Sequence, residues 1–227
     1  PSLEKVRFLP LNCKISFILS LIIYIFESSI YSIFKFNILF FNILHFGKLI
    51  LKQAADKVQR VTMELSGHSP FIVFDDVDLN KVTDMAITSK FRNNGQVCIS
   101  PNRFYIHESK KDEFANLMVE KTKKLKIGNG MDKDTLLGPL CTKQRLDGVE
   151  KLVETTKKEG GKLLLGGKRD ANFNKGYYYE PTIFDNIKDN FTIMKEEPFG
   201  PIVPILSFKN FDEVMDRAND NDLGLCS

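Results

Sequence analysis

Residues 69–109 read SPFIVFDDVDLNKVTDMAITSKFRNNGQVCISPNRFYIHES, and this stretch decides the fold. The runs SPFIVFDD (69–76) and RFYIHES (103–109) are short and apolar and end in polar residues, as buried strands do. Between them, KVTDMAITSKFRNN (81–94) is long enough for a helix and carries apolar residues at intervals. The stretch therefore predicts a strand, a helix and a second strand in succession.

The flanking sequence continues this alternation. Asp78 or Asn80 stands where the N-cap of the helix is expected. Upstream, GKLILKQAADKV (47–58) predicts an amphipathic helix and RVTMEL (60–65) a short strand. Downstream we expect helices at 110–125, 142–159 and 211–220, and strands in KLLLGG (162–167), YYYEPTIF (177–184) and PIVPILSF (201–208). Strands that alternate with helices indicate an α/β fold with a substantial parallel component.

Composition narrows the classes of function. The chain has 227 residues, 43% of them hydrophobic and 27% charged, which is ordinary for a globular protein. A formal net charge of +3 is too small to indicate binding to nucleic acid or to an anionic membrane. The four cysteines form no CxxC pair and have no histidine cluster nearby. We therefore predict no disulfide framework and no metal site, and a reducing compartment.

Residues 14–46 differ sharply in composition from the rest of the chain. They are rich in Ile, Phe, Leu, Asn and Lys, contain no Gly, Pro, Ala or Val, and sustain no regular period. Three interpretations compete: translated non-coding sequence from an AT-rich gene, a membrane segment, and a buried core segment. The first leads, because the apolar runs are shorter than the roughly 20 residues of a membrane span and are interrupted by Glu27, Lys35 and Asn37.

Two residues outside that segment are candidates for nucleophilic catalysis. Cys98 follows a predicted helix and the pair Gly95–Gln96, where Gly95 would let the backbone turn tightly and backbone N–H groups could assist thiolate formation. An isolated cysteine is, however, more often a small buried apolar residue. Glu64, in MELSGHSP, could project into a cleft as a general base, or could be a surface glutamate. A dyad of Cys98 with His68 is the weaker hypothesis, because a loop histidine is more often exposed.

The loop EEPFGPIVP (196–204) is a candidate cofactor site. It combines two carboxylates, an aromatic ring, a glycine and nearby prolines. Glu197 could accept hydrogen bonds from ribose hydroxyls, and Phe199 could contact a flat cofactor ring. Phe199 could equally belong to the core. The glycines at 128–130 and 166–167 match no phosphate-binding pattern, so we interpret them as turns.

In combination and in this order, MELSGHSP, FRNNGQVC and EEPFGP resemble the three signatures of the aldehyde dehydrogenase superfamily. The resemblance runs from Gly47 to Ser227 and includes LLGPL, GYYYEPTIF and ANDNDLGLCS. Within the superfamily, FRNNGQVCISPNRF is most similar to the succinate-semialdehyde dehydrogenase branch. The resemblance implies the α/β catalytic domain of that fold, truncated at both ends, and a cofactor that is NAD or NADP.

The resemblance also implies a chemistry for each candidate residue. Cys98 would attack a small-molecule aldehyde, which would be oxidised to a thioester of the cysteine. Glu64 would activate the water that hydrolyses this thioester to the carboxylic acid. Glu197 would hold the ribose and Phe199 the nicotinamide. Arg92, six residues before Cys98, would bind the distal carboxylate of succinate semialdehyde or a similar substrate. The alternative for Arg92 is a solvent-facing helix residue.

Departures from the family pattern set the expected domain organisation. Ser66 replaces a glycine, which places local geometry in doubt. We interpret residues 1–46 as a non-homologous segment, 47–63 as the remnant of a cofactor-binding domain, and 64–227 as a C-terminally incomplete catalytic domain. We therefore expect this chain alone to be inactive and its parent to be a cytoplasmic or mitochondrial homo-oligomer. A non-catalytic or a membrane-anchored relative remains the alternative.

Overall fold

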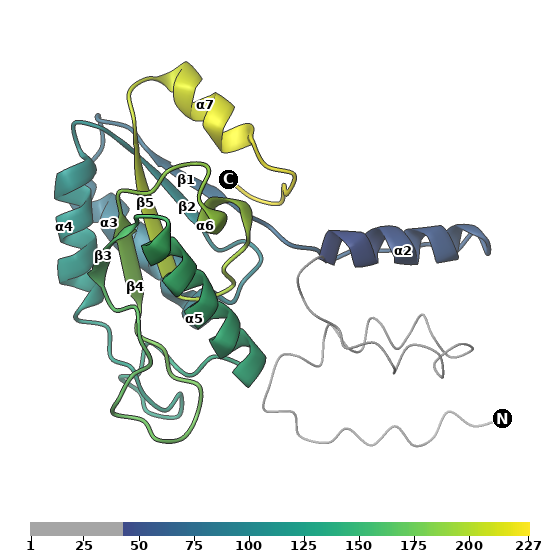
Figure 1. Cartoon of the computed structure of the whole chain (residues 1–227), viewed down its shortest axis with the longest axis horizontal. Coiled ribbons are helices and arrows are strands. Elements are labelled where there is room, and N and C mark those ends of the chain that lie inside the picture. The colour runs from purple at the N-terminus through teal and green to yellow at the C-terminus, as the bar shows by residue number, and fades with distance from the viewer. Residues whose placement is uncertain (1–42) are drawn as a thin grey trace. The chain divides into compact units, whose positions relative to one another are not determined.

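The structure, a computed structural model, describes residues 43–227 (Figure 1). The three interpretations of the apolar segment fall almost wholly on residues outside this range. The first element is helix α2 (Ile43–Ala55), in the region of the helix predicted at 47–58. The strand predicted at 60–65 is wrong, because residues 59–69 have no regular secondary structure. Within residues 43–227, no strand pairs with this segment, so its alternating pattern does not produce a strand.

The predicted strand–helix–strand unit is confirmed. Strand β1 (Pro70–Val73) leads through helix α3 (Leu79–Phe91) to strand β2 (Arg103–His107), and the two strands pair in parallel. Asp78 is the N-cap of α3. Its carboxylate accepts hydrogen bonds from the backbone N–H groups of Asn80 and Lys81, at 3.1 and 3.3 Å. The helix therefore begins where the first of the two predicted caps places it.

The remaining elements complete a five-stranded sheet in the order β1-β2-β5-β4-β3. All neighbouring strands are parallel except the edge strand β3, which is antiparallel to β4. The fold is thus α/β with a mainly parallel sheet, as predicted. The elements after β2 are α4 (Lys111–Thr122), α5 (Lys143–Lys158), β3 (Lys162–Leu165), β4 (Thr182–Asp185), α6 (Thr192–Lys195), β5 (Ile202–Phe208) and α7 (Phe211–Asn219).

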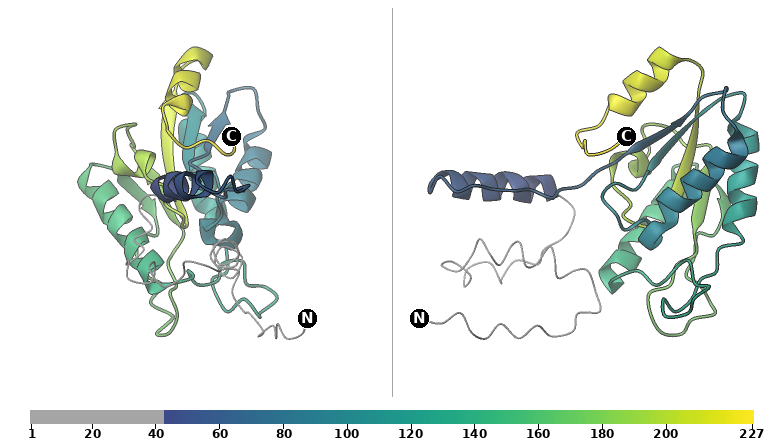
Figure 2. Two further views of the ribbon diagram at one scale, coloured as in Figure 1. Left: turned by 90° about the vertical axis from the view of Figure 1, so that its right-hand side faces the viewer. Right: turned by 180° about the vertical axis from the view of Figure 1, so that it is seen from behind.

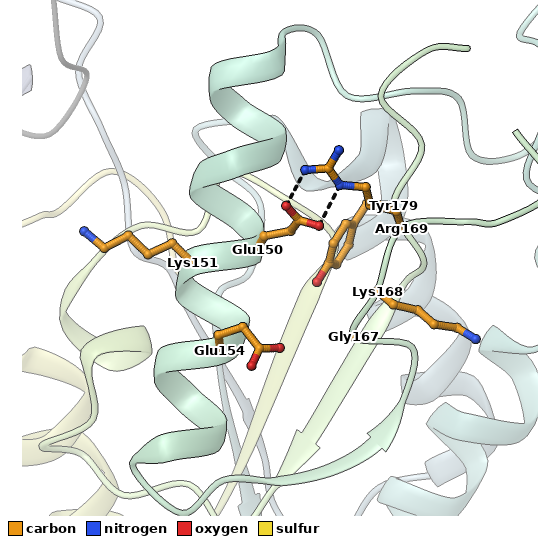
Figure 3. A pocket seen from close by; sticks show the side chains of 7 residues that line it. All are labelled: Glu150, Lys151, Glu154, Gly167, Lys168, Arg169 and Tyr179. Atoms are coloured by element: carbon orange, nitrogen blue, oxygen red, sulfur yellow. Dashed lines mark hydrogen bonds and ion pairs between the residues drawn. The ribbon is translucent and has the colours of Figure 1, made fainter. Parts of the chain in front are cut away.

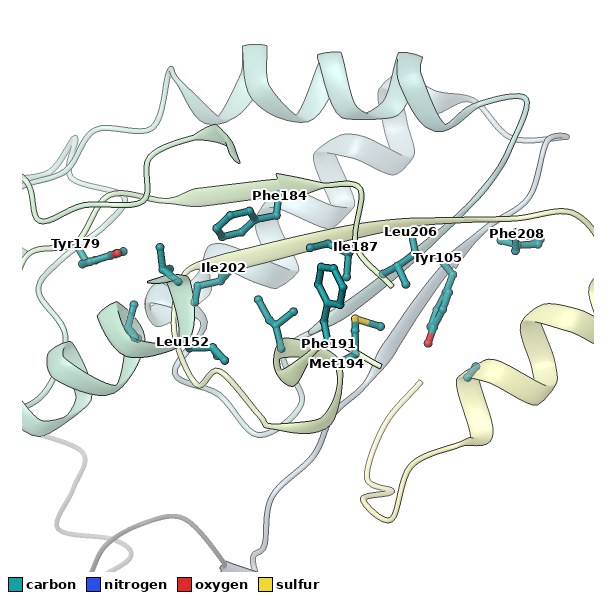
Figure 4. Packing of buried hydrophobic residues seen from close by; sticks show 14 of the residues in the cluster. Tyr105, Leu152, Tyr179, Phe184, Ile187, Phe191, Met194, Ile202, Leu206 and Phe208 are labelled. Atoms are coloured by element: carbon teal, nitrogen blue, oxygen red, sulfur yellow. The ribbon is translucent and has the colours of Figure 1, made fainter. Parts of the chain in front are cut away.

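Helices cover both faces of this sheet, as Figure 2 shows edge-on. The side chains of β2 alternate between two hydrophobic clusters, as the two-residue period of a strand requires. Phe104 and Ile106 pack with α3 and α4, whereas Tyr105 packs with α5, α6 and α7. Figure 4 shows the cluster that contains Tyr105. None of the helices within residues 43–227 has the length and apolar composition needed to cross a membrane.

The topology brings the three signature segments to one edge of the sheet. Residues 64–68 precede β1, residues 93–98 precede β2, and residues 196–200 precede β5. These three strands are adjacent and parallel, so their amino ends lie side by side. Open α/β sheets usually bind ligands at the carboxyl ends of their strands. Here the candidate residues gather at the opposite edge.

Candidate active site

Gly67 makes the closest approach between the signature segments. A β-carbon on Gly67 would collide with the carbonyl oxygen of Cys98, so only a glycine allows the two backbones this separation. The Gly67 N–H also donates to Glu197 Oε1, at 3.5 Å. One residue therefore contacts both other segments. The close approach falls at Gly67, one position after Ser66, where the departure from the family pattern raised doubt.

A second glycine joins the Cys98 loop to the loop that carries Glu197. Gly95 has φ +69°, and a β-carbon there would collide with the carbonyl oxygen of Gly200. The two preceding residues, Asn93 and Asn94, also have positive φ values of 51° and 57°. These left-handed residues are not helical; they form a kink inside the short segment η2 (Arg92–Gly95), which turns the chain sharply between α3 and the cysteine.

Two amides hold the Cys98 loop against the segment that leads into α5. Gln96 accepts a hydrogen bond from the backbone N–H of Cys141 at 2.9 Å and donates to the carbonyl of Asn93 at 3.1 Å. The side-chain amide of Asn94 donates to the carbonyl of Gly138. Cys98 itself carries a free thiol and is partly exposed. A fixed backbone with a partly accessible thiol is the setting that a nucleophilic cysteine requires.

Glu197 lies half-buried beside this loop. Burial raises the pKa of its carboxyl above the ordinary value, while hydrogen bonds from Ser66 and Gly67 and the charges of Arg145 and Lys90 lower it. The burial effect is the larger, so the group carries an elevated pKa. The hydrogen bonds and the two cations favour the ionised form of Glu197, and an ionised carboxylate can accept further hydrogen bonds from a ligand.

Phe199 is held by an arginine that the sequence reasoning missed. The guanidinium of Arg145, on the first turn of α5, lies over the Phe199 ring at 5.1 Å from its centroid. It also donates to the carbonyl of Pro198 at 3.4 Å. Phe199 has φ +41° and is half-buried, so it belongs to the loop surface and not to the buried core. An aromatic ring and a carboxylate that accepts hydrogen bonds thus lie on the same loop, and their contact with a nicotinamide nucleoside stays a prediction.

This geometry can be set beside known proteins. A model described as "Aldehyde dehydrogenase family" matches residues 38–227. The chain belongs to the aldehyde dehydrogenase family. It spans a little over a third of the length of the curated relatives that it matches, with 38% of the first of them covered.

Two curated relatives and one solved structure show the range of the family. The chain is 44% identical to 3,6-anhydro-alpha-L-galactose dehydrogenase of Vibrio sp. (strain EJY3), over 80% of this chain and 38% of that protein. It is 38% identical to succinate-semialdehyde dehydrogenase [NADP(+)] 2 of Schizosaccharomyces pombe, over 79% and 36%. The NAD+ complex of an aldehyde dehydrogenase from Bacillus cereus superposes with a TM-score of 0.76 at 38% identity, covering 80% and 36%.

Glu64 is the predicted base of this aldehyde dehydrogenase chain, and its side chain is exposed. It lies in the irregular segment before β1, not at a strand end as predicted. It stands three positions before Gly67, so its α-carbon lies within about 11 Å of the glycine that contacts Cys98. Its position is thus on the same edge of the sheet, and its part in the chemistry stays a prediction.

Arg92 and His68 have contrasting environments. Arg92 begins η2 and is exposed, which leaves its guanidinium accessible beside the Cys98 loop. His68 is buried, contrary to the exposed loop residue that we expected. Burial, together with the charges of Arg103 and Lys90, lowers the pKa of His68 to about 3. An imidazole with so low a pKa is a poor proton acceptor for a thiol at neutral pH, which disfavours the Cys98–His68 dyad.

Sequence reasoning also missed two buried polar residues behind the site, Lys90 and Asn102. Both are fully buried, and Lys90 donates to the Asn102 side-chain oxygen at 2.7 Å. The helical spacing of the sequence could have revealed Lys90. Lys90 follows Leu79, Thr83 and Ala86 on the buried face of α3, at the spacing where an apolar residue is expected.

A separate hollow of about 520 Å³ lies between α5 and the segment after β3 (Figure 3). Two of its charged side chains pair with each other: Arg169 donates to both carboxylate oxygens of Glu150, at 2.6 and 2.5 Å. None of the predicted site residues lines it. Within residues 43–227, no group of three or more His, Cys, Asp or Glu side chains is placed to hold a metal ion.

Proposed function

We propose that this chain supplies the nucleophile-bearing part of an NAD(P)-dependent aldehyde dehydrogenase, which oxidises an aldehyde to its carboxylic acid. The observation that carries the proposal is the meeting of three segments at Gly67, which contacts Cys98 on one side and Glu197 on the other. Cys98 and Glu197 thus share one edge of the sheet, which supports their proposed roles as nucleophile and cofactor-binding carboxylate.

Cys98 performs the covalent step. Its thiolate sulfur forms a bond to the aldehyde carbon, and the carbonyl electron pair moves onto oxygen to give a thiohemiacetal. The adduct would expel its hydride to a nicotinamide held by Glu197 and Phe199, which would leave the carbon as a thioester of Cys98. Glu64 then takes a proton from water, whose oxygen attacks the thioester carbon. The Cys98 sulfur leaves as thiolate and the product is a carboxylic acid.

Glu197 and Phe199 hold the nicotinamide nucleoside in this proposal. An ionised Glu197 accepts hydrogen bonds from ribose hydroxyls, and hydrogen bonds to an ionised carboxylate are stronger than those to a neutral acid. The Phe199 ring, held from one side by Arg145, supports the flat nicotinamide. The cofactor is NAD or NADP, because the names of the related proteins include both.

The proposed substrate is succinate semialdehyde or a similar aldehyde with a distal carboxylate. The exposed guanidinium of Arg92 supports this choice, since it can donate two parallel hydrogen bonds to a carboxylate. The relative from Vibrio is named for an uncharged sugar aldehyde, 3,6-anhydro-alpha-L-galactose. The deciding comparison is therefore between an aldehyde that carries a carboxylate and an uncharged one.

The test is protection of Cys98 from alkylation by iodoacetamide. Trypsin releases Cys98 in residues 93–103 and Cys141 in residues 134–143, so mass spectrometry follows each thiol separately. Succinate semialdehyde should slow alkylation of Cys98 and leave that of Cys141 unchanged. In Arg92→Gln, protection by succinate semialdehyde should weaken, whereas protection by butyraldehyde should persist. Alkylation of Cys98 at one rate with and without aldehyde would contradict the proposal.

The same experiment tests the first alternative function, because a non-catalytic relative would show no aldehyde protection at Cys98. Carbonate extraction tests the second, because a membrane-anchored enzyme would stay in the membrane fraction. We further propose that hydride transfer requires the part of the family's length that this chain does not span. The chain with aldehyde and NAD or NADP should therefore form the Cys98 adduct without producing NADH or NADPH.

A further inference from the structure

Lys90 is an unusual residue at the back of the site. Its side chain is fully buried in the last turn of α3, at a position of the helix face otherwise occupied by Leu79 and Ala86. Burying an ammonium group is costly unless it is paired and hydrogen-bonded. Its side-chain partner is the neutral amide oxygen of Asn102, at 2.7 Å, not a carboxylate. This hydrogen bond therefore gives the Lys90 ammonium group no negative charge to neutralise it.

Asn102 connects Lys90 to the centre of the site. Asn102 immediately precedes β2, and its own backbone N–H is fixed to the carbonyl of Ser69 at 2.9 Å. Its side-chain N–H donates to the carbonyl of Gly67 at 3.5 Å. A side-chain amide that accepts from a cation becomes a stronger donor on its other side, because linked hydrogen bonds polarise one another.

Gly67 is the residue that touches both Cys98 and Glu197. Its carbonyl accepts from Asn102, its N–H donates to Glu197 Oε1, and its α-carbon lies against the Cys98 carbonyl. Fixing the carbonyl side of this glycine restricts the orientation of its backbone. The N–H that faces Glu197 is therefore held from behind by the pair Lys90–Asn102.

The charge of Lys90 reaches the same carboxylate. Lys90 opposes protonation of Glu197, as does Arg145 from α5. His68, from the segment before β1, is another titratable group near Lys90, and burial together with the charges of Arg103 and Lys90 lowers its pKa to about 3, so it is neutral at neutral pH. Glu197 is the group whose negative charge favours the ammonium form of Lys90. Lys90 and Glu197 therefore each favour the ionised form of the other.

We propose that Lys90 is a positioning residue of this site, which acts through Asn102 to fix Gly67 and, with it, the N–H group that faces Glu197. The proposal rests on the roles proposed above for Cys98 and Glu197. Lys90 touches neither aldehyde nor cofactor. It holds the cofactor-binding carboxylate ionised and oriented, and it holds the backbone against which the Cys98 loop packs.

The test follows the backbone amide of Gly67 by ¹H–¹⁵N NMR as the pH is lowered. This N–H donates to Glu197, so its chemical shift reports protonation of that carboxyl. In Lys90→Met the midpoint should rise by about one pH unit, since a nearby opposite charge lowers a carboxyl pKa by about one to three. Lys81→Met is the matched control: it removes an exposed cation from the same helix and should leave the midpoint unchanged.

A second variant covers the case in which Lys90→Met does not fold. Asn102→Asp keeps the oxygen that accepts from Lys90 but removes the N–H that reaches Gly67, and its new carboxylate neutralises the ammonium. The Gly67 midpoint should rise here too. In both variants, aldehyde protection of Cys98 from alkylation should weaken, whereas a lysine with a merely structural role would leave both readouts unchanged in a folded variant.

The two readouts keep the proposals apart. The NMR titration uses no aldehyde and no cofactor, so it can succeed or fail independently of the chemistry at Cys98. An unmoved Gly67 midpoint, or unchanged protection of Cys98 in folded variants, would overturn the positioning role of Lys90. Absence of aldehyde protection in the wild-type chain would instead overturn the proposed function.

Discussion

The backbone N–H of Gly67 points at the carboxylate of Glu197, 3.5 Å away and 130 residues later in the sequence. The two residues precede β1 and β5, which are not neighbours in the sheet; β2 lies between them. The contact therefore passes across the amino end of β2, where the Cys98 loop enters its strand. It closes the site around the cysteine, and its geometry depends on the absence of a side chain at Gly67.

Gly67→Ala should disrupt this arrangement. The added β-carbon would meet the Cys98 carbonyl and would lie 3.2 Å from the β-carbon of Leu225. Because the first obstacle is backbone, one segment must shift, and overpacking of this kind costs about 1–3 kcal/mol of unfolding free energy. Urea denaturation measures that loss, and alkylation of Cys98 should change in rate.

Gly148→Ala is the control for that substitution. Gly148 lies inside α5 and a β-carbon there has no atom within 4 Å. Alanine is the better helix former, so this variant should gain about 0.5–1 kcal/mol. Equal effects of the two substitutions would show that the contact between Gly67 and Cys98 contributes nothing.

Glu197→Gln should change how stability depends on pH. Burial raises the pKa of Glu197 above its ordinary value of 4.5, so the folded chain binds this proton more tightly than the unfolded chain. As the pH rises from about 4.5 through the elevated pKa, the group's contribution to the unfolding free energy falls. The variant, which cannot ionise, should lack this fall. Urea denaturation at several pH values compares the two, and parallel curves would refute the assignment.

Asp78→Ala should destabilise the helix that leads to the Cys98 loop. The variant loses the two hydrogen bonds that cap α3, which typically costs about 1 kcal/mol. Asp76→Ala, two residues earlier and also exposed, should change stability by less than about 0.5 kcal/mol. Thermal unfolding followed by circular dichroism distinguishes them, and a loss in Asp76→Ala as large as in Asp78→Ala would contradict the cap.

Local signals were sufficient for most of the elements. The apolar run at 70–73, the cap at Asp78 and the apolar run at 202–208 each depend on neighbouring residues alone, and each lies where it was predicted. The strand prediction for RVTMEL failed for the opposite reason. Its alternating pattern is local, but a strand also needs hydrogen bonds to a neighbouring strand, and within residues 43–227 this segment pairs with none.

The contacts of the site depended on information that is not local. The resemblance selected Cys98, Glu64 and Glu197, but nothing in the sequence showed that Gly67 would contact both Cys98 and Glu197, because the strand order decides which segments meet. Arg145 and Asn102 were missed because their partners, Phe199 and Lys90, are brought to them only by packing. Lys90 alone could have been found, as a cation on the apolar face of a predicted helix.

Lys90 provides the last prediction. Burial lowers the pKa of Lys90 from its ordinary value of 10.5 to about 7. Between those two values the unfolded chain binds the proton and the folded chain does not, so the unfolding free energy rises with pH, by at most about 1.4 kcal/mol per pH unit. Below pH 7 both states carry the charge, and the slope from this group vanishes.

Lys90→Met removes the titrating group, so the wild-type chain should gain stability relative to this variant as the pH rises from 7 towards 9.5, within the window that the two pKa values set. Urea denaturation across that range measures the difference, and Lys81→Met, which removes an exposed lysine, should follow the wild-type curve. A constant difference between wild type and Lys90→Met would mean that Lys90 keeps its charge in the folded chain over this range. The ammonium would then be compensated beyond the hydrogen bond to Asn102, by the carboxylate of Glu197 acting more strongly than burial.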